Sequence, residues 1–165
     1  MAKAWRLAIA VVLVPLSLLA GPVRSERTEP ITRVDQIAGK YYLGKGLGFT
    51  FTLTVHPDGT FSSIWRGCLG IYAEASGSAF LRDGELVLEP VSRKGGTSRG
   101  LETRFLPIRW GERQYLVPSD QRLELAYQIN EGHEPRSSSF GNVYLREGDW
   151  DKPVAGEPDL PAEGP

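Results

Sequence analysis

The chain has 165 residues, of which 41% are hydrophobic, and this is enough for one domain with an apolar core but short for two. Its 19 basic and 20 acidic residues nearly cancel to a formal net charge of −1, which gives no electrostatic reason to bind nucleic acid or an anionic membrane. The single cysteine, Cys68, excludes an internal disulfide. We therefore expect a domain that is held together by its hydrophobic core.

The N-terminal 25 residues have the pattern of a cleavable signal peptide. Lys3 and Arg6 precede an uncharged stretch over residues 7–20, which is shorter than the roughly 20 apolar residues of a membrane span. Small Ser25 suits the position before the cut, whereas a cut after Ala20 leaves a bulky residue two positions earlier. We expect cleavage after Ser25, export to the periplasm or the extracellular space, and no stable membrane anchor afterwards. An uncleaved anchor is the alternative.

Alternation of apolar and polar residues dominates the rest of the chain and predicts β-strands. The clearest strand runs from Phe49 to Val55, where large apolar residues alternate with threonines, and Pro57-Asp58-Gly59 then turns the chain. Asp83-Gly84 has the composition of a two-residue hairpin turn. We expect a bulge at Pro107, because its missing N–H cannot join a ladder. The expected strands cover residues 39–43, 49–55, 60–66, 70–80, 86–88, 101–110, 113–117 and 140–146.

One short helix is expected before the last strand. Ser119 or Asp120 can cap its start, and Gly132 is placed to end it. Four residues fall together on one side of this helix: Leu123, Ala126, Tyr127 and Asn130.

The chain divides into four parts. Residues 1–25 are the signal peptide, 26–36 a polar lead-in, 37–147 the folded unit, and 148–165 an acidic, proline-rich tail that we expect to be disordered. Many short strands with regular turns and one helix indicate a mostly β fold, an antiparallel barrel or sandwich. Eight strands are enough to close a small up-and-down barrel that removes exposed edges and can hold one small ligand. We expect a monomer.

Three segments of the folded unit resemble lipocalin-like domains: Asp35-Gln36-Ile37-Ala38-Gly39-Lys40-Tyr41-Tyr42-Leu43, the hairpin from Leu53 to Phe61, and the hairpin from Gly77 to Leu88. The unit also resembles uncharacterised secreted bacterial proteins, through Tyr42-Leu43-Gly44-Lys45-Gly46-Leu47-Gly48 and Trp65-Arg66-Gly67-Cys68-Leu69-Gly70. The resemblance implies an eight-stranded barrel with Tyr41 at its floor. Arg146 then either covers Tyr41 in a cation–π contact or lies in solvent at a strand end, and we favour the second.

Few residues carry recognisable chemistry. The glycines at alternate positions over residues 44–48 precede a strand rather than a helix, so they predict a tight turn and not a phosphate-binding loop. We expect Cys68 to be a small buried residue, because a nucleophilic thiolate would need His56 or His133 beside it. No metal-ligand spacing or catalytic motif is present in the sequence. We expect no metal and no cofactor, and an enzyme is our third-ranked hypothesis.

Aromatic residues spread over most of the strands are the remaining candidates for a site. Inside a barrel they either line an apolar pocket or simply fill the core. The residues that we name as ligand contacts are Tyr41, Phe51, Trp65, Tyr72, Phe105, Tyr115, Tyr144 and Arg146. The leading hypothesis is an exported lipocalin-like protein that binds a small, partly apolar molecule. The alternative is a secreted or periplasmic interaction or structural module with a solid core, whose partner would be an envelope protein.

Overall fold

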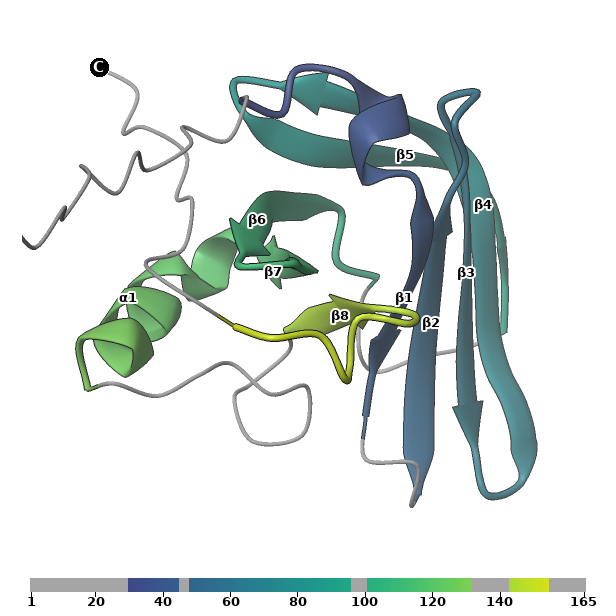
Figure 1. Cartoon of the computed structure of the whole chain (residues 1–165). Helices are drawn as coiled ribbons and strands as arrows, with labels where there is room; N and C mark the ends of the chain where they lie inside the picture. The colour runs from purple at the N-terminus through teal and green to yellow at the C-terminus, as the bar shows by residue number, and fades with distance from the viewer. Residues whose placement is uncertain (1–29, 45–47, 96–100, 132–142, 155–165) are drawn as a thin grey trace, which may run out of the picture.

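The strands form one closed, entirely antiparallel barrel, in which sequence neighbours pair and the last strand returns to the first (Figure 1). The structure is a computed structural model that describes residues 30–44, 48–95, 101–131 and 143–154. Its strands are β1 (Gly39–Leu43), β2 (Phe49–Val55), β3 (Thr60–Gly67), β4 (Gly70–Arg82), β5 (Glu85–Lys94), β6 (Arg104–Trp110), β7 (Arg113–Pro118) and β8 (Tyr144–Arg146). The predicted fold class is therefore confirmed. The signal peptide, Gly132 and His133 lie outside the described residues.

Alternation along the strands builds the interior of the barrel. Every strand contributes at least one side chain to a single buried cluster, and the strand residues between them face outward. The members of this cluster are Ile37, Tyr41, Leu43, Leu53, Val55, Phe61, Ala79, Leu86, Leu88, Phe105, Leu116 and Tyr144. Because they come from all eight strands, they define the packed inside of the barrel.

A second buried cluster lies on the outer face of β6, β7 and β8. It consists of Leu106, Ile108, Trp110, Tyr115, Val117, Leu125, Val143 and Leu145. The helix α1 (Arg122–Asn130), which follows the 3-10 turn η2 (Ser119–Gln121), covers this face with Leu125 and Ile129. The side of the helix that carries Leu123 and Tyr127 is exposed. Neither this helix nor the shorter helical turns of the described ranges could cross a membrane.

The positions at which the pairing register of the strands shifts differ from the predicted bulge at Pro107. The register of β6 against β7 runs without a shift through Pro107, so the expected bulge is wrong. β6 pairs with β5 only at Arg104 and Phe105, so the missing N–H of Pro107 breaks no ladder on that side. The register instead shifts between Trp65 and Arg66, and again between Ser76 and Gly77.

The hairpin turns follow their sequence signals. Asp83 and Gly84 join β4 to β5 with φ values of 53° and 77°, as a primed two-residue turn requires. β5 runs from Glu85 to Lys94, well beyond the predicted end at residue 88. It continues along β4 after its short ladder with β6 has ended.

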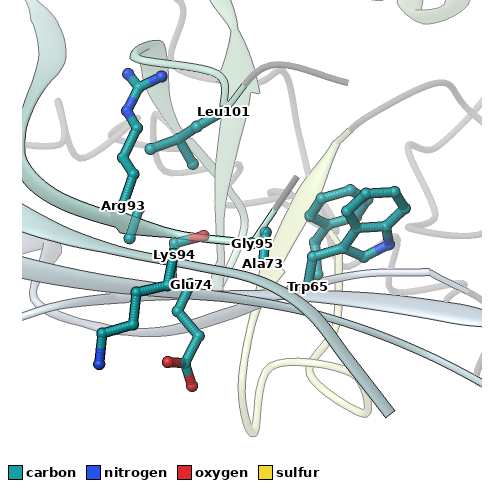
Figure 2. A pocket seen from close by; sticks show the side chains of 10 residues that line it. Trp65, Ala73, Glu74, Arg93, Lys94, Gly95 and Leu101 are labelled. Carbon is teal, nitrogen blue, oxygen red and sulfur yellow. The ribbon is translucent and has the colours of Figure 1, made fainter. Parts of the chain in front are cut away.

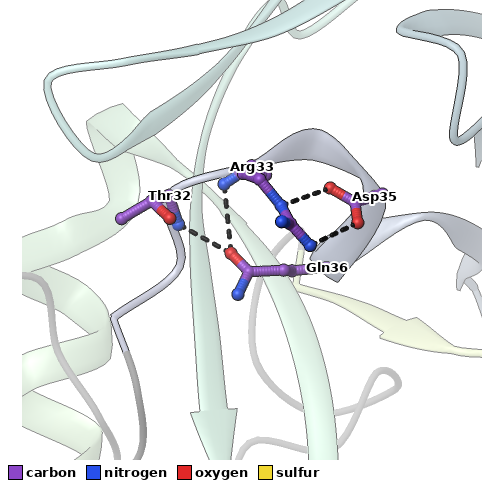
Figure 3. Close-up of polar contacts among 4 residues, drawn as sticks. All are labelled: Thr32, Arg33, Asp35 and Gln36. Carbon is purple, nitrogen blue, oxygen red and sulfur yellow. Dashed lines mark hydrogen bonds and ion pairs between the residues drawn. The ribbon is translucent and has the colours of Figure 1, made fainter.

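One end of the barrel is closed by the 3-10 turn η1 (Val34–Ile37). The side-chain oxygen of Gln36 accepts hydrogen bonds from the backbone N–H groups of Thr32 and Arg33, and the Arg33 guanidinium pairs with Asp35 (Figure 3). This local network fixes the turn, and Ile37 then enters the barrel core with no exposed surface. The packed unit therefore begins before residue 37.

Arg146 ties this closed end together. Its guanidinium donates to the carbonyl of Ala38 at 2.9 Å and to the side-chain oxygen of Gln114 at 3.0 Å, and Gln114 donates onward to the carbonyl of Gln36 at 3.3 Å. The expectation of a solvated strand-end charge is wrong, because Arg146 follows the inward-facing Tyr144 by two residues and so points to the same side. The side chain links β8, β7 and the segment before β1.

The chain after β8 also belongs to the packed structure. The carboxylate of Asp149 is 3% exposed, accepts the backbone N–H of Gln114 at 2.9 Å and pairs with Lys152 at 2.6 Å. The guanidinium of Arg113 donates to the carbonyl of Lys152 at 2.7 Å. Residues 149–154, which we placed in the tail, thus lie against β7, and residues 155–165 are outside the described ranges.

Candidate functional site

Four aromatic rings form a row on the inner face of the long strands. Phe49 meets Phe51 edge-on with ring centroids 5.9 Å apart, and Phe51 stacks on Trp65 at 5.1 Å with an interplanar angle of 8°. Trp65 meets Tyr72 edge-on at 5.1 Å. Phe51 and Trp65 are direct cross-strand partners, which places both rings on the same face of the sheet. None of the four residues is fully buried.

The register shift in β3 and β4 brings Tyr72 into this row. Trp65 pairs with Ala73 while Arg66 pairs with Ile71, so Tyr72 is the extra residue of a β-bulge. A bulge turns one side chain out of its normal alternation, and here the ring reaches the edge of the indole. Gly67 lies directly under that ring, because a Cβ atom there would overlap the Tyr72 side chain.

Two rings of this row, Phe51 and Trp65, line a pocket of about 170 Å³ (Figure 2). Its lining comes from β2, β3, β4, β5 and the segment after β5: Phe51, Ser63, Trp65, Ala73, Glu74, Ala75, Arg93, Lys94, Gly95 and Leu101. The small side chains of Ala73 and Ala75 leave the space that the larger neighbours do not fill. An engineered apolar cavity of about 150 Å³ holds a benzene ring, so this pocket has room for a molecule with one ring.

The charged residues of the lining lie on two sides of the sheet. Arg93 is the cross-strand partner of Ala75, whose side chain packs against the barrel core, and Lys94 is the partner of Glu74. In Figure 2 the Arg93 side chain extends toward Leu101, whereas the Lys94 ammonium and the Glu74 carboxylate extend from the opposite side of the strands. Among the described lining residues, the Arg93 guanidinium is therefore the charged group on the inner side of the sheet.

One further polar side chain belongs to the wall. Ser63 is 8% exposed and follows the inward-facing Phe61 by two residues along β3, and its hydroxyl can donate or accept. The indole Nε1 of Trp65 is buried and makes no hydrogen bond within the described part of the chain. In Figure 2 this nitrogen lies on the side of the indole that faces away from Arg93 and Leu101, so Trp65 offers the pocket its ring and not its N–H.

The structure separates the aromatic residues that the sequence suggested as ligand contacts. Phe51, Trp65 and Tyr72 lie together in the row beside the pocket. Tyr41, Phe105 and Tyr144 fill the packed core instead, where the rings of Phe105 and Tyr144 meet edge-on at 5.4 Å. Burial raises the pKa values of the Tyr41 and Tyr144 phenols.

Two other predicted contacts are also remote from the pocket lining. Tyr115 lies in the outer cluster under α1, because its neighbour Leu116 takes the inward position on β7. Arg146 is engaged at the closed end with Ala38 and Gln114. Sequence reasoning missed Arg93, Leu101 and the two alanines as lining residues. The sequence did not point to Arg93, because the strand predicted there ended at residue 88 and β5 extends to Lys94.

Cys68 is exposed, which contradicts the expected burial. It lies at the tip of the hairpin between β3 and β4, where turn residues meet solvent, and its Sγ lies 3.6 Å from the carbonyl of Gly48. His56 precedes β3, so the eight-residue strand separates the two by roughly 25 Å. Within the described ranges no three His, Cys, Asp or Glu side chains are grouped closely enough to hold a metal ion.

Comparisons with protein-family models, with curated proteins and with solved structures found no match to this chain.

Proposed function

We propose that this protein is exported and that its lipocalin-like barrel binds a small, partly apolar molecule in the pocket beside Phe51 and Trp65. The observation that carries the proposal is the row of incompletely buried rings along a pocket of about 170 Å³. Rings that only fill a core are usually covered, as Phe105 and Tyr144 are in the same barrel. The contrast supports a contact surface rather than a packing role for Phe51 and Trp65.

The division of the barrel supports the same proposal. At the closed end, side chains from all eight strands are packed solid and η1 covers them. The pocket lies further along, where β3, β4 and β5 continue past the short ladder between β5 and β6. In a small barrel, tightly packed side chains at one end can keep the fold rigid while the other end leaves space for one small ligand.

Export rests on the sequence of residues 1–25, with two positive charges before a short apolar stretch and Ser25 before the cut. Mass spectrometry of the protein recovered from the periplasm or medium of its host tests this part. A mature form that begins at Glu26 supports export with cleavage after Ser25. A form that retains Met1 contradicts it.

A pocket-filling substitution tests binding. Ala73 lines the pocket, whereas Ser76 on the same strand is exposed and not part of the lining, so Ala73→Leu and Ser76→Leu form a matched pair. We expect ligand-observed NMR with benzyl alcohol, phenylacetate and 2-phenylethylamine to detect binding of at least one compound to the wild type and to Ser76→Leu. Ala73→Leu is expected to lose it. If none of the three binds the wild type, and native mass spectrometry of the host-purified protein finds no bound molecule, the proposal fails.

A second candidate function is an interaction module, and the tip of the β3–β4 hairpin favours it. Leu69 is 91% exposed and Ile71 is 53% exposed, and apolar side chains of this size at a hairpin tip are typical of contact surfaces. Cross-linking through Cys68 in the envelope fraction, with Leu69→Ser as the comparison, tests this candidate. A protein neighbour that is captured by the wild type and lost in Leu69→Ser supports it, and no captured neighbour contradicts it.

A further inference from the structure

We propose that the pocket selects a single-ring molecule with a negatively charged arm, in which the ring lies against Phe51 and Trp65 and the anionic group pairs with Arg93. This inference rests on the proposed function and names the chemical class of the ligand.

The strand register places Arg93 on the side of the cavity. Residues that are directly opposite each other in an antiparallel ladder share a face of the sheet. Arg93 is opposite Ala75, and Ala75 packs against the barrel core, so the Arg93 side chain leaves the strand on the inner side. Leu101, which also lines the pocket, lies toward the same side in Figure 2.

Among the described lining residues, the inner side of the pocket carries a positive charge. Glu74 is the acidic residue of this lining, and its carboxylate lies on the outer side with Lys94, its cross-strand partner. Arg93 is exposed and forms no ion pair or hydrogen bond with another residue of the described ranges. A cationic ligand would bring a second positive charge beside this guanidinium, whereas an anionic ligand would pair with it.

The hydrogen-bonding side chains on the inner side point to the same ligand class. The guanidinium of Arg93 can donate but cannot accept, and the Ser63 hydroxyl can do both. A carboxylate offers two acceptor oxygens and matches the planar fork of an arginine. These two groups thus favour a ligand that brings acceptor oxygens and a negative charge.

The size of the cavity limits the apolar part of the ligand. A pocket of about 170 Å³ exceeds the roughly 150 Å³ that holds benzene by only the space of a short arm. Phe51 and Trp65 stack with nearly parallel rings, and the Phe49 ring extends the same aromatic surface toward solvent. An aromatic ring with a one- or two-carbon acid arm fits both limits, and phenylacetate is the simplest probe.

Isothermal titration calorimetry with phenylacetate, benzyl alcohol and 2-phenylethylamine tests the inference on the wild type and two variants. Arg93→Gln removes the inner charge, and Arg66→Gln removes an exposed charge of β3 that is not part of the lining, so both change the net charge equally. We expect phenylacetate to bind the wild type about three- to fivefold more tightly than the other two probes, since an ion pair with an exposed guanidinium contributes up to about 1 kcal/mol. Arg93→Gln should lose about three- to fivefold for phenylacetate alone, and Arg66→Gln should change its affinity by less than about 1.5-fold.

The outcomes separate this inference from the proposed function. Equal affinities for the three probes, or equal losses in Arg93→Gln and Arg66→Gln, would overturn the selection of an anion while leaving a ligand pocket in place. Absence of binding by all three probes in the calorimeter and in NMR would overturn this inference, and it would overturn the proposed function as well if native mass spectrometry also finds no bound molecule. Circular dichroism of each variant shows whether the barrel is still folded, and the unchanged binding of benzyl alcohol to Arg93→Gln shows that the pocket itself is intact.

Discussion

The phenol of Tyr41 donates a hydrogen bond of 2.7 Å to the backbone carbonyl of Ile37, which ties the first strand to the turn that covers the closed end of the barrel. Both residues are fully buried. A buried carbonyl that loses its partner cannot turn to water, so the cost of removal exceeds the net value of an ordinary hydrogen bond.

Tyr41→Phe is expected to lower the free energy of unfolding by about 1–3 kcal/mol, because it leaves the Ile37 carbonyl without this donor and opens a small gap. Urea denaturation at neutral pH measures the change. Tyr42→Phe is the matched control, since the Tyr42 phenol donates to the exposed carboxylate of Glu147 at 2.8 Å and its loss should cost less than about 0.5 kcal/mol. Equal losses in the two variants would contradict a structural role for the buried bond.

Alkaline pH should destabilise the barrel through Tyr41 and Tyr144. Burial raises the pKa of both phenols in the folded protein, whereas in the unfolded chain they lose their protons near pH 10. The unfolded state then binds fewer protons, so stability is fully present below about pH 10 and falls as pH rises above it, by up to about 1.4 kcal/mol per pH unit for each phenol.

Urea midpoints at pH 8, 10 and 11 measure this dependence. At pH 8 the Tyr144→Phe variant should be as stable as the wild type or less stable. Between pH 8 and pH 11 it should lose less stability than the wild type loses. Tyr127→Phe, on the exposed side of α1, is the comparison. A pH profile that is the same in the wild type and in Tyr144→Phe would contradict the buried neutral state of this phenol.

Much of the barrel could be predicted from the sequence because the local signals agreed with one another. The alternation of Phe49 to Val55 gave the strand and its inner face, and the Asp83-Gly84 pair gave both positive φ values of its turn. The helix shows the limit of such signals. The side that carries Leu123 and Tyr127 is exposed, because the outer face of β6 to β8 accepts Leu125 and Ile129 instead.

The candidate site was only half predictable, for a physical reason. Aromatic composition pointed to Phe51, Trp65 and Tyr72, but an isolated sequence does not show which rings a barrel covers. Tyr115, Leu116 and Val117 form an apolar run on β7 that is buried on both faces, so the sequence does not show that Leu116 faces the interior and Tyr115 faces the helix. Arg93 belongs to a strand whose polar second half lacks the apolar alternation that reveals a strand.

Asp149 should contribute more to the free energy of unfolding than its position after the last strand suggests. Its carboxylate is 3% exposed and accepts the backbone N–H of Gln114, so Asp149→Ala leaves a buried donor on β7 unpaired. We expect a loss of about 1–3 kcal/mol in urea denaturation. Asp151→Ala, at an exposed position two residues later, should change stability by less than about 0.5 kcal/mol. A similar loss in both variants would show that general charge, and not this bond, is responsible.

Substitutions at Gly67 and Tyr72 should have non-additive effects on the free energy of unfolding. A Cβ at residue 67 would overlap the Tyr72 ring, so Gly67→Ala has to displace that ring from the edge of Trp65. We expect Gly67→Ala to cost about 1–3 kcal/mol in the wild type and clearly less in a Tyr72→Ala background, where the obstacle is gone. Trp65 fluorescence, measured with Trp5, Trp110 and Trp150 replaced by phenylalanine, reports the same displacement. If the losses of the two single variants simply add in the double variant, the Cβ at residue 67 is accommodated by a shift other than that of the Tyr72 ring.

The shortness of β8 has a consequence for how the chain folds. β8 contributes two residue pairs to β1 and two to β7, and the Tyr42 and Glu147 side chains that meet beside this seam are 105 residues apart. Because β8 is the strand that pairs with both β1 and β7, the sheet has two unpaired edges whenever this three-residue strand is not docked. Unpaired edges are where sheets pair with other chains, so docking of Tyr144–Arg146 removes both aggregation sites at once.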